Sequence, residues 1–179
     1  SSFSMQYYNS DGKLASLCGN GSRCITAFAH HLGISDKCMR FEAFDGIHTA
    51  RIIEQKSEIE WEIEIEMRLN SQIQTFEDGY FLDTGSPHFV QFVNNIEEID
   101  VYEQGKRLRY DTRFPNGCNV NFVEIRNNSI FVRTYERGVE DETLACGTGV
   151  TASALFLKET MGGNKKKYIF CRSGDEITV

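Results

Sequence analysis

Hydrophobic and charged residues alternate strictly along residues 58–67, which read EIEWEIEIEM. Isoleucine, tryptophan and methionine occupy the odd positions from Ile59 to Met67, and glutamate occupies every even position. An alternation of period two is typical of a strand with one buried and one solvent-exposed face. We therefore predict a strand over 58–67 and assign its glutamates to a solvated face rather than to a metal site.

Two other stretches repeat their apolar positions with the period of a helix. The stretch ITAFAHHLGI predicts a helix that ends at Gly33, with an apolar face formed by Ile25, Phe28, Ala29 and Leu32. The stretch VTASALFLKETMGG predicts a second helix that ends at Gly162 and Gly163, with Val150, Ala154 and Leu155 on its apolar face. Glycine just after the last periodic residue is a common helix stop.

A Cys-Gly-x-Gly sequence precedes each predicted helix. The first copy lies in SLCGNGSRC and carries Cys18, and the second lies in TLACGTGVTAS and carries Cys146. Each helix is followed by two extended segments joined at a glycine, in MRFEAFDGIHTARII and YIFCRSGDEITV. The same number of positions separates Cys18 from Gly46 and Cys146 from Gly174. We interpret this common spacing as a duplicated strand–loop–helix–hairpin unit.

The repeat predicts two halves, residues 1–72 and 73–179, with the boundary in the polar stretch 70–75. The run before Cys146 in the second half is much longer than the run before Cys18 in the first. We therefore expect the first half to lack its opening segment and the second half to lack its final strands. On this interpretation, the sequence is an interior portion of a longer protein.

Composition narrows the class of protein. The chain has 179 residues, 40% hydrophobic residues and a formal net charge of −7, which is typical of a globular protein and argues against nucleic acid or anionic membranes as partners. No apolar run approaches the roughly 20 residues of a membrane span, and no signal-peptide pattern opens the chain. The six cysteines show no zinc-ligand spacing, so we expect thiols in a reducing cytoplasm and no metal.

A cysteine at a helix N-terminus has a chemical use. Unpaired N–H groups and the helix dipole favour the thiolate, and glycines after the sulfur let backbone N–H groups bind a carboxylate. Two such sites on opposite sides of one molecule suit inversion of a stereocentre, in which one thiolate removes a proton and one thiol returns it. The sequence contains no Walker loop and no dinucleotide fingerprint, so we expect no cofactor.

At these residues, the chain resembles the diaminopimelate epimerase family. The resemblance is carried by YYNSDGKLASLCGNGSRC, DTGSPHFVQFV, FPNGCNVNFVEI and TYERGVEDETLACGTGVTASA, which appear in the family's order. It implies a mixed α+β fold of two pseudo-symmetric halves, each a curled, mostly antiparallel sheet around a central helix, with the active site in the cleft between them. It also implies a cytoplasmic homodimer that acts in lysine and peptidoglycan precursor synthesis.

The resemblance assigns roles to particular residues. Cys18 and Cys146 would be the two acid/base thiols, supported by His88 and Glu136. The α-carboxylate would be bound by Gly19, Asn20, Gly147 and Thr148, and the other end of the substrate by Asn9, Asn119, Glu136 and Arg137. Ser86 would also contact the substrate, at a position where the family usually has asparagine.

Two alternatives remain at this point. A related two-cysteine enzyme, such as a proline racemase or a phenazine-synthesis-type isomerase, would use the same architecture. In a protein of another class, a thiol-rich binding or redox module, Cys18 and Cys146 would form a reversible disulfide. The pair Glu136 and Arg137 favours an amino acid with a charged distal end, because proline has no such end. The remaining cysteines are predicted to act as small apolar residues.

Overall fold

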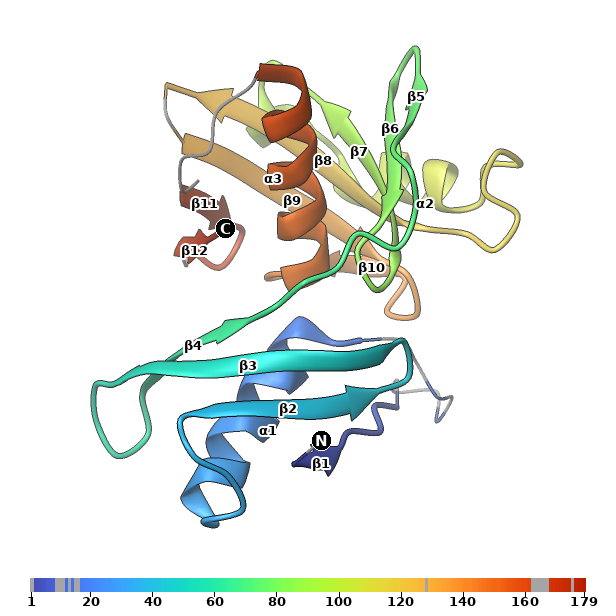
Figure 1. Ribbon diagram of the computed structural model, residues 1–179. Coiled ribbons are helices and arrows are strands. Elements are labelled where there is room, and N and C mark those ends of the chain that lie inside the picture. Colours follow the sequence, from blue (N-terminus) through green and yellow to red (C-terminus); the bar gives the residue numbers. More distant parts are fainter. Residues whose placement is uncertain are drawn as a thin grey trace. The chain divides into compact units, whose positions relative to one another are not determined.

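A computed structural model of the protein describes residues 2–8, 12, 14, 17–127, 129–161, 168–174 and 176–179. It divides into an N-terminal unit, Ser1–Arg68, and a C-terminal unit, Leu69–Val179 (Figure 1). The sequence places this boundary four positions later, between residues 72 and 73. Each unit has its own sheet and its own apolar core, so each is described separately.

The N-terminal unit is a four-stranded sheet with one helix packed on it. Its strands are β1 (Phe3–Ser4), β2 (Cys38–Ala43), β3 (Gly46–Gln55) and β4 (Trp61–Ile65), in that spatial order. The helix α1 (Gly19–His31) connects β1 to β2, which are parallel, and the remaining pairs are antiparallel. Leu17, Ala29, Met39, Phe41 and Ile52 contribute to the core between helix and sheet.

The buried face of α1 differs from the predicted one. Phe28 and Leu32 are 59% and 53% exposed, whereas Ser22 and Thr26 are fully buried beside Ala29. The buried hydroxyls are satisfied within the helix, because Ser22 Oγ donates to the carbonyl of Cys18 at 2.8 Å and Thr26 Oγ1 donates to that of Ser22 at 2.7 Å. Small residues that bond to the preceding turn therefore form the packing surface, which hydrophobic periodicity alone does not detect.

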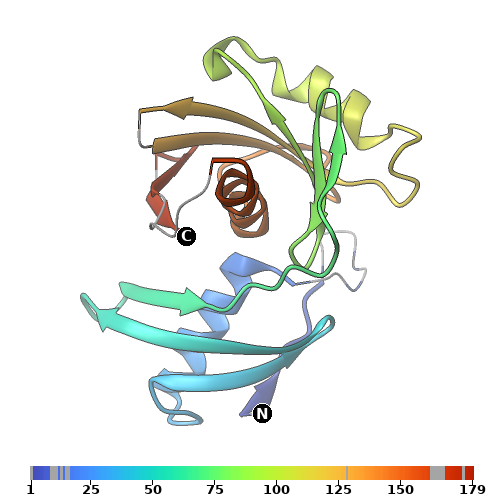
Figure 2. The same cartoon turned by 45° about the horizontal axis from the view of Figure 1, so that its top comes forward.

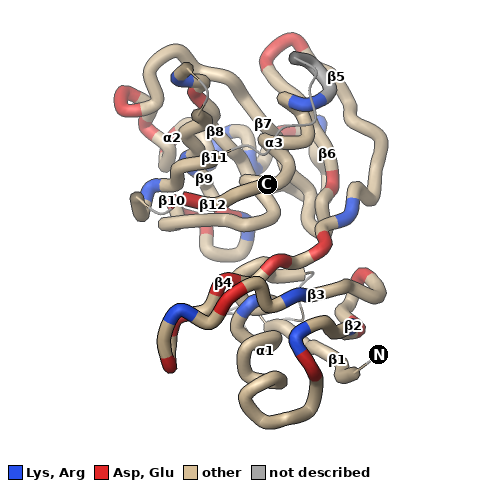
Figure 3. Tube along the Cα trace, turned by 60° about the vertical axis from the view of Figure 1, so that its left-hand side comes forward, with Lys and Arg blue, Asp and Glu red and all other residues tan. Residues whose placement is uncertain are grey.

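The predicted alternating strand is confirmed for β4 but starts later than expected. Trp61, Ile63 and Ile65 are half-buried, whereas Ile59 is 94% exposed and precedes the strand. Glu62 and Glu64 of β4 are exposed, and the acidic positions of β4 lie along the neighbouring strand β3 (Figure 3). Arg51 of β3 bonds Glu64 at 2.6 Å, and Lys56, just after β3, approaches Glu62 at 3.4 Å. The acidic face is thus a solvated, partly neutralised sheet surface.

The C-terminal unit is a larger curled sheet that surrounds a helix. Its principal path runs β12-β11-β9-β8-β7-β6-β5, and β10 pairs with β9. The strands are β5 (Gln74–Phe76), β6 (Gly79–Asp83), β7 (Pro87–Phe92), β8 (Asn119–Arg126), β9 (Ser129–Glu136), β10 (Asp141–Thr143), β11 (Tyr168–Cys171) and β12 (Glu176–Thr178). The helix α3 (Gly147–Met161) lies inside the curve of this sheet, as the end-on view of Figure 2 shows.

The helix α3 is buried on most of its surface rather than on one face. The predicted apolar residues Val150 and Ala154 are buried and Leu155 is half-buried, but Ala152 and Phe156 are buried as well. A helix buried on several sides carries apolar and small residues all round. The predicted apolar face was therefore correct in its members but too narrow.

A second core lies on the opposite face of the C-terminal sheet. There, a short 3-10 helix, η1 (Ile96–Glu98), and the helix α2 (Val101–Arg109) cover Val120, Phe122 and Tyr135 (Figure 2). Alternate residues of β8 therefore face opposite helices: Val120 and Phe122 belong to the core with α2, and Val123 belongs to the core with α3. This alternation decides which polar side chains of the strand face α3.

The predicted repeat is visible in the connectivity of both units. The helix α1 joins the parallel strands β1 and β2, and the short strand β10 followed by α3 connects the parallel strands β9 and β11. In each unit a hairpin follows, and its turn contains a glycine with positive φ, 123° at Gly46 and 85° at Gly174. The predicted mixed α+β fold, with a sheet and a central helix in each half, is confirmed; the cleft between the halves stays a prediction.

Within the described residues, no helix has the length and apolarity that crossing a membrane requires.

Candidate functional site

In the N-terminal unit, Cys18 is the residue that caps α1. Its backbone is extended, with φ −106° and ψ 112°, and its Sγ accepts the backbone N–H of Gly21 at 3.3 Å. A side chain in this position satisfies one of the N–H groups that have no partner inside the helix. Asp, Asn, Ser and Thr usually fill this position, so a sulfur there places a reactive group where backbone N–H groups stabilise negative charge.

The two residues that follow Cys18 differ in burial. Gly19 is buried at the first position of α1, and Asn20 is exposed, with its Oδ1 accepting a hydrogen bond from the Arg23 guanidinium. The predicted substrate contact Asn9 lies outside the described residues.

In the C-terminal unit, Cys146 directly precedes α3. Its side chain is 8% exposed, and its Sγ lies 3.4 Å from the hydroxyl oxygen of Thr148. Gly147 is the first residue of α3. The carbonyl of Thr148 accepts the hydroxyl of Thr84 at 2.9 Å, which ties the loop before β7 to the first turn of α3. All six cysteines of the chain are described, and all are present as thiols.

Strand directions bring the other predicted residues of this unit to one edge of the sheet. The strands β7 and β8 are parallel, and His88 pairs with Asn119 near their starts. The strand β9 is antiparallel to β8, so its end, at Glu136 and Arg137, lies beside the start of β8. Parallel neighbours begin at the same edge, and an antiparallel neighbour ends there. The sequence motifs around these residues, far apart in the chain, therefore meet.

Asn119 connects three segments at this edge. Its Nδ2 donates to Ser86 Oγ at 2.9 Å and to the carbonyl of Pro87 at 3.1 Å, and its Oδ1 accepts the backbone N–H of Arg137 at 2.9 Å. Asn119 is 4% exposed and Ser86 is 8% exposed. Ser86, at the position of the expected asparagine, is thus held by the Asn119 amide.

The charged pair at the end of β9 is partly desolvated. Burial raises the pKa of Glu136, an effect that the Thr143 hydroxyl opposes. Burial, and then the positive charge of Arg109, lowers the pKa of Arg137. The Arg137 guanidinium donates to the carbonyl of Asn116 at 3.2 Å, and no carboxylate in the described part of the chain forms an ion pair with it. A half-buried guanidinium that has no carboxylate partner among the described residues is suited to bind a carboxylate ligand.

His88 is fully buried beside the first turn of α3. Burial, together with the charge of Arg137, lowers its pKa to about 3 against the opposing effect of the Asn121 hydrogen bond, so the imidazole is neutral. Asn121 Nδ2 lies 3.1 Å from His88 Nδ1, and Asn121 Oδ1 accepts the hydroxyl of Thr134 at 3.0 Å. A methyl group placed on Gly149 would lie 2.2 Å from Asn121 Oδ1 and 3.3 Å from His88 Cε1. The asparagine and the imidazole are therefore packed directly against α3.

Asn121 and Thr134 are not among the residues predicted from the sequence. A signal was present, because NVNFVEI places Asn119 and Asn121 two residues apart and hence on one face of a strand. Buried asparagines in a strand require partners, so their repeated appearance on one face indicates a polar network.

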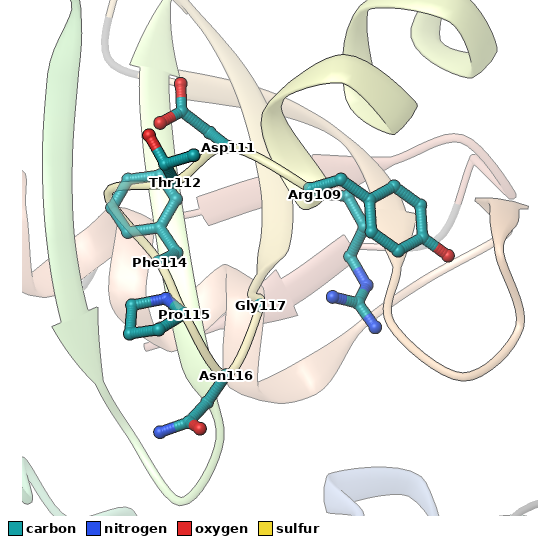
Figure 4. A pocket seen from close by; sticks show the side chains of 8 residues that line it. Arg109, Asp111, Thr112, Phe114, Pro115, Asn116 and Gly117 are labelled. Atoms are coloured by element: carbon teal, nitrogen blue, oxygen red, sulfur yellow. The ribbon is translucent and has the colours of Figure 1, made fainter.

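The described residues also line a pocket of about 430 Å³ in the loop that follows α2 (Figure 4). It is formed by Arg109, Tyr110, Asp111, Thr112, Phe114, Pro115, Asn116 and Gly117. Arg109 pairs there with Glu140 at 3.1 Å. None of the predicted site residues lines this pocket, but Arg137 of the polar edge bonds the carbonyl of Asn116, one of the lining residues.

Comparison with known sequences identifies one family. The family model described as "Diaminopimelate epimerase" matches residues 80–179. A diaminopimelate epimerase of Flavobacterium psychrophilum is 42% identical over 179 residues, covering 99% of this chain and 68% of the relative. One of Aquifex aeolicus is 41% identical over 187 residues, covering 99% of this chain and 66% of the relative. The chain thus spans about two thirds of the length of these relatives.

Solved structures show the same fold at low sequence identity. A Bacillus anthracis phenazine biosynthesis protein of the PhzF family matches with a TM-score of 0.72 and 14% identity, covering 98% of this chain and 70% of the other. A PhzF-family protein of Enterococcus faecalis matches with a TM-score of 0.61 and 15% identity, covering 98% of this chain and 69% of the other. At this identity the likeness concerns the fold alone.

Proposed function

Because the chain belongs to the diaminopimelate epimerase family, we propose that its protein interconverts LL- and meso-diaminopimelate without a cofactor, using Cys18 and Cys146 as the two acid/base groups. The predicted family is confirmed by relatives about 40% identical over nearly the whole chain. The observation that carries the proposal is the matched position of the two thiols, each directly before the first residue of a helix.

The proposed reaction is a proton transfer with no change of oxidation state. One sulfur, as thiolate, takes the proton from the α-carbon, and the electron pair of the broken C–H bond remains on the substrate next to the α-carboxylate. The other sulfur, as thiol, gives its proton to the opposite face of that carbon, which inverts its configuration. Backbone N–H groups at a helix start stabilise the charge that develops on a carboxylate.

The polar edge of the C-terminal unit supports an assignment for the rest of the substrate. Arg137 would bind the distal carboxylate, because its half-buried guanidinium has a carbonyl partner and no carboxylate partner among the described residues. The acceptor atoms of Glu136 and Asn119 would bind the distal ammonium. Proline has no such distal end, which disfavours a proline racemase. The two-cysteine isomerase alternative would be revealed by activity on a substrate other than diaminopimelate.

Deuterium exchange tests the proposal. Incubation of the full-length enzyme with LL-diaminopimelate in D₂O is expected to give meso product that carries deuterium at the inverted carbon. Cys18→Ala and Cys146→Ala should each abolish interconversion, whereas Cys118→Ala, which removes a buried thiol of the core around α2, serves as the matched control. Normal turnover by either of the first two variants would refute the two-thiol mechanism.

We also propose that the protein acts as a cytoplasmic homodimer in lysine and peptidoglycan precursor synthesis, as its family membership suggests. Light scattering of the full-length protein checks the dimer. A monomer with full activity would contradict this part of the proposal alone.

A further inference from the structure

The orientation of the Asn121 side chain follows from its neighbours. One atom of its amide lies 3.1 Å from the carbonyl oxygen of Phe89, and a carbonyl can only accept a hydrogen bond. That atom is therefore the nitrogen, Nδ2. The other atom, Oδ1, accepts the hydroxyl of Thr134 at 3.0 Å, which is consistent with the same orientation.

This orientation fixes the protonation of His88. The nitrogen of Asn121 that donates to Phe89 also lies 3.1 Å from His88 Nδ1, and its second hydrogen is available for a bond to that atom. A donor requires an acceptor, so His88 Nδ1 carries no proton. Because the ring is neutral, the proton must reside on Nε2. The imidazole is thus held as its Nε2–H tautomer by a chain that runs from Thr134 through Asn121.

The Nε2–H group of His88 is a buried donor. The atom is shielded from solvent, and it has no hydrogen-bond partner within the described part of the chain. A buried donor without a partner costs about 1–3 kcal/mol, so its presence calls for an explanation. The ring lies beside Gly149, three residues after Cys146, at the start of α3. A negatively charged group that forms or binds during the reaction would supply the missing hydrogen-bond acceptor of Nε2–H.

We propose that Asn121 is a positioning residue which, together with Thr134, holds His88 as the Nε2–H tautomer so that Nε2 donates a hydrogen bond to an anion of the reaction. That anion is either a catalytic thiolate or a carboxylate of the substrate. The inference rests on the proposed epimerase function and adds that His88 acts as a neutral donor and not as a base. Its Nδ1, the only unprotonated ring nitrogen, is already occupied by the Asn121 amide.

The tautomer is measured without turnover. In the full-length protein with ¹⁵N-labelled histidine, the His88 signals are identified by their loss in His88→Gln, which separates them from those of His30, His31 and His48. The proposal expects an unprotonated Nδ1 and a protonated Nε2 across the neutral pH range. A protonated Nδ1 would overturn it. The tautomer can be measured whether or not the protein is active. Absence of epimerase activity would therefore refute the proposed function without affecting the assignment of the tautomer.

Kinetics of Asn121→Asp test the consequence. A carboxylate at this position accepts a hydrogen bond, so it draws a proton to His88 Nδ1 and changes the tautomer or charges the ring. We expect kcat to fall between about tenfold and about 10⁴-fold, the range seen when an imidazole loses its orienting partner, with a shifted pH profile. An unchanged kcat and pH profile in this variant would overturn the proposal.

Thr134→Val is a less disruptive substitution, to be used if Asn121→Asp does not fold. It removes the hydroxyl that bonds Asn121 Oδ1, and we expect a smaller fall in kcat with KM nearly unchanged. Thr26→Val is its matched control, because Thr26 is also buried but donates its hydroxyl within α1. Equal kcat values for these two variants would count against the proposal.

The two possible anions give different results in Asn121→Asp. If Nε2–H faces a thiolate, the pH dependence of cysteine alkylation in the substrate-free enzyme shifts. If it faces a substrate carboxylate, alkylation is unchanged and the dissociation constant of the substrate rises. If neither quantity changes, the proposed donor role of His88 is refuted.

Discussion

The Oδ1 atom of Asn119 accepts the backbone N–H of Arg137 at 2.9 Å, so the end of β9 is held by the start of β8. The same side chain donates to Ser86 and Pro87. One buried amide thus sets the relative positions of three segments that the resemblance assigns to substrate binding.

Replacing Asn119 by alanine should destabilise the protein and impair its activity. The change leaves the Arg137 N–H and the Pro87 carbonyl without their partner, a loss of about 1–3 kcal/mol in the free energy of unfolding. We expect kcat/KM to fall by at least about tenfold, since Arg137 loses its support. Urea denaturation and steady-state kinetics measure the two effects. Asn70→Ala, which truncates an exposed amide, should change the unfolding free energy by less than about 0.5 kcal/mol.

Two glycine-to-alanine changes should have different consequences. A methyl on Gly149 would lie 2.2 Å from Asn121 Oδ1, and a methyl on Gly105 would lie 2.4 Å from Tyr135 Cβ. Overpacking of this kind costs about 1–3 kcal/mol, although alanine normally stabilises a helix relative to glycine. Both variants should therefore unfold at lower urea concentration. Gly149→Ala alone should also lower kcat, because it displaces the Asn121–His88 pair; equal kcat values in the two variants would contradict this.

The stability of the N-terminal unit should depend on the protonation of His48. Its Nε2 lies 3.0 Å from Asp45 Oδ1 and its Nδ1 lies 3.2 Å from the carbonyl of Glu66, so both nitrogens face acceptors. The Asp45 hydrogen bond raises the pKa of His48 despite its burial and the opposing charge of Arg68. A raised folded-state pKa gives stabilisation that is complete below the unfolded value of about 6.5 and is lost as pH rises through the folded value.

The measurement uses Trp61, the single tryptophan of the chain, which lies in the N-terminal unit. Urea unfolding followed by its fluorescence should show that Asp45→Asn destabilises the unit more at acidic than at alkaline pH. An equal loss of unfolding free energy at both extremes would refute the role of the imidazolium.

The cysteines should differ widely in reactivity outside the proposed catalytic pair. Burial raises the pKa of Cys118 to about 12, so only about one molecule in ten thousand carries its thiolate at pH 8. Cys24 and Cys38 are exposed. Iodoacetamide should therefore modify Cys24 and Cys38 in the native protein, and Cys118 only after denaturation, as peptide mass spectrometry can show. Rapid native modification of Cys118 would indicate that the core around α2 opens readily.

Features encoded by neighbouring residues could be predicted from the sequence. The helix starts after Cys18 and Cys146, and the turns at Gly46 and Gly174, depend on local backbone preferences and on a repeat that the chain displays directly. The alternation of β4 could likewise be recognised, because burial of one sheet face imposes a period of two.

Features that depend on distant partners could not be predicted. The sequence does not show that Ser22 and Thr26 replace Phe28 on the packed face of α1, because their hydroxyls are satisfied only once the helix has formed. The register that places Asn121 beside His88 depends on the parallel pairing of β7 and β8. Hydrophobic patterns define which face of a strand is buried, but they do not define which strand lies next to it.

The enclosure of α3 within its sheet also limits how this scaffold could be redesigned. Replacing a buried side chain of α3, such as Val150 or Phe156, would disturb its packing against several strands at once. The segments 84–86 and 137–140, by contrast, connect strands at the sheet edge and carry Ser86 and Arg137, two of the proposed substrate contacts. Attempts to alter which amino acid the enzyme accepts would therefore begin with libraries in these two connections, keeping the helix and the strand interiors constant.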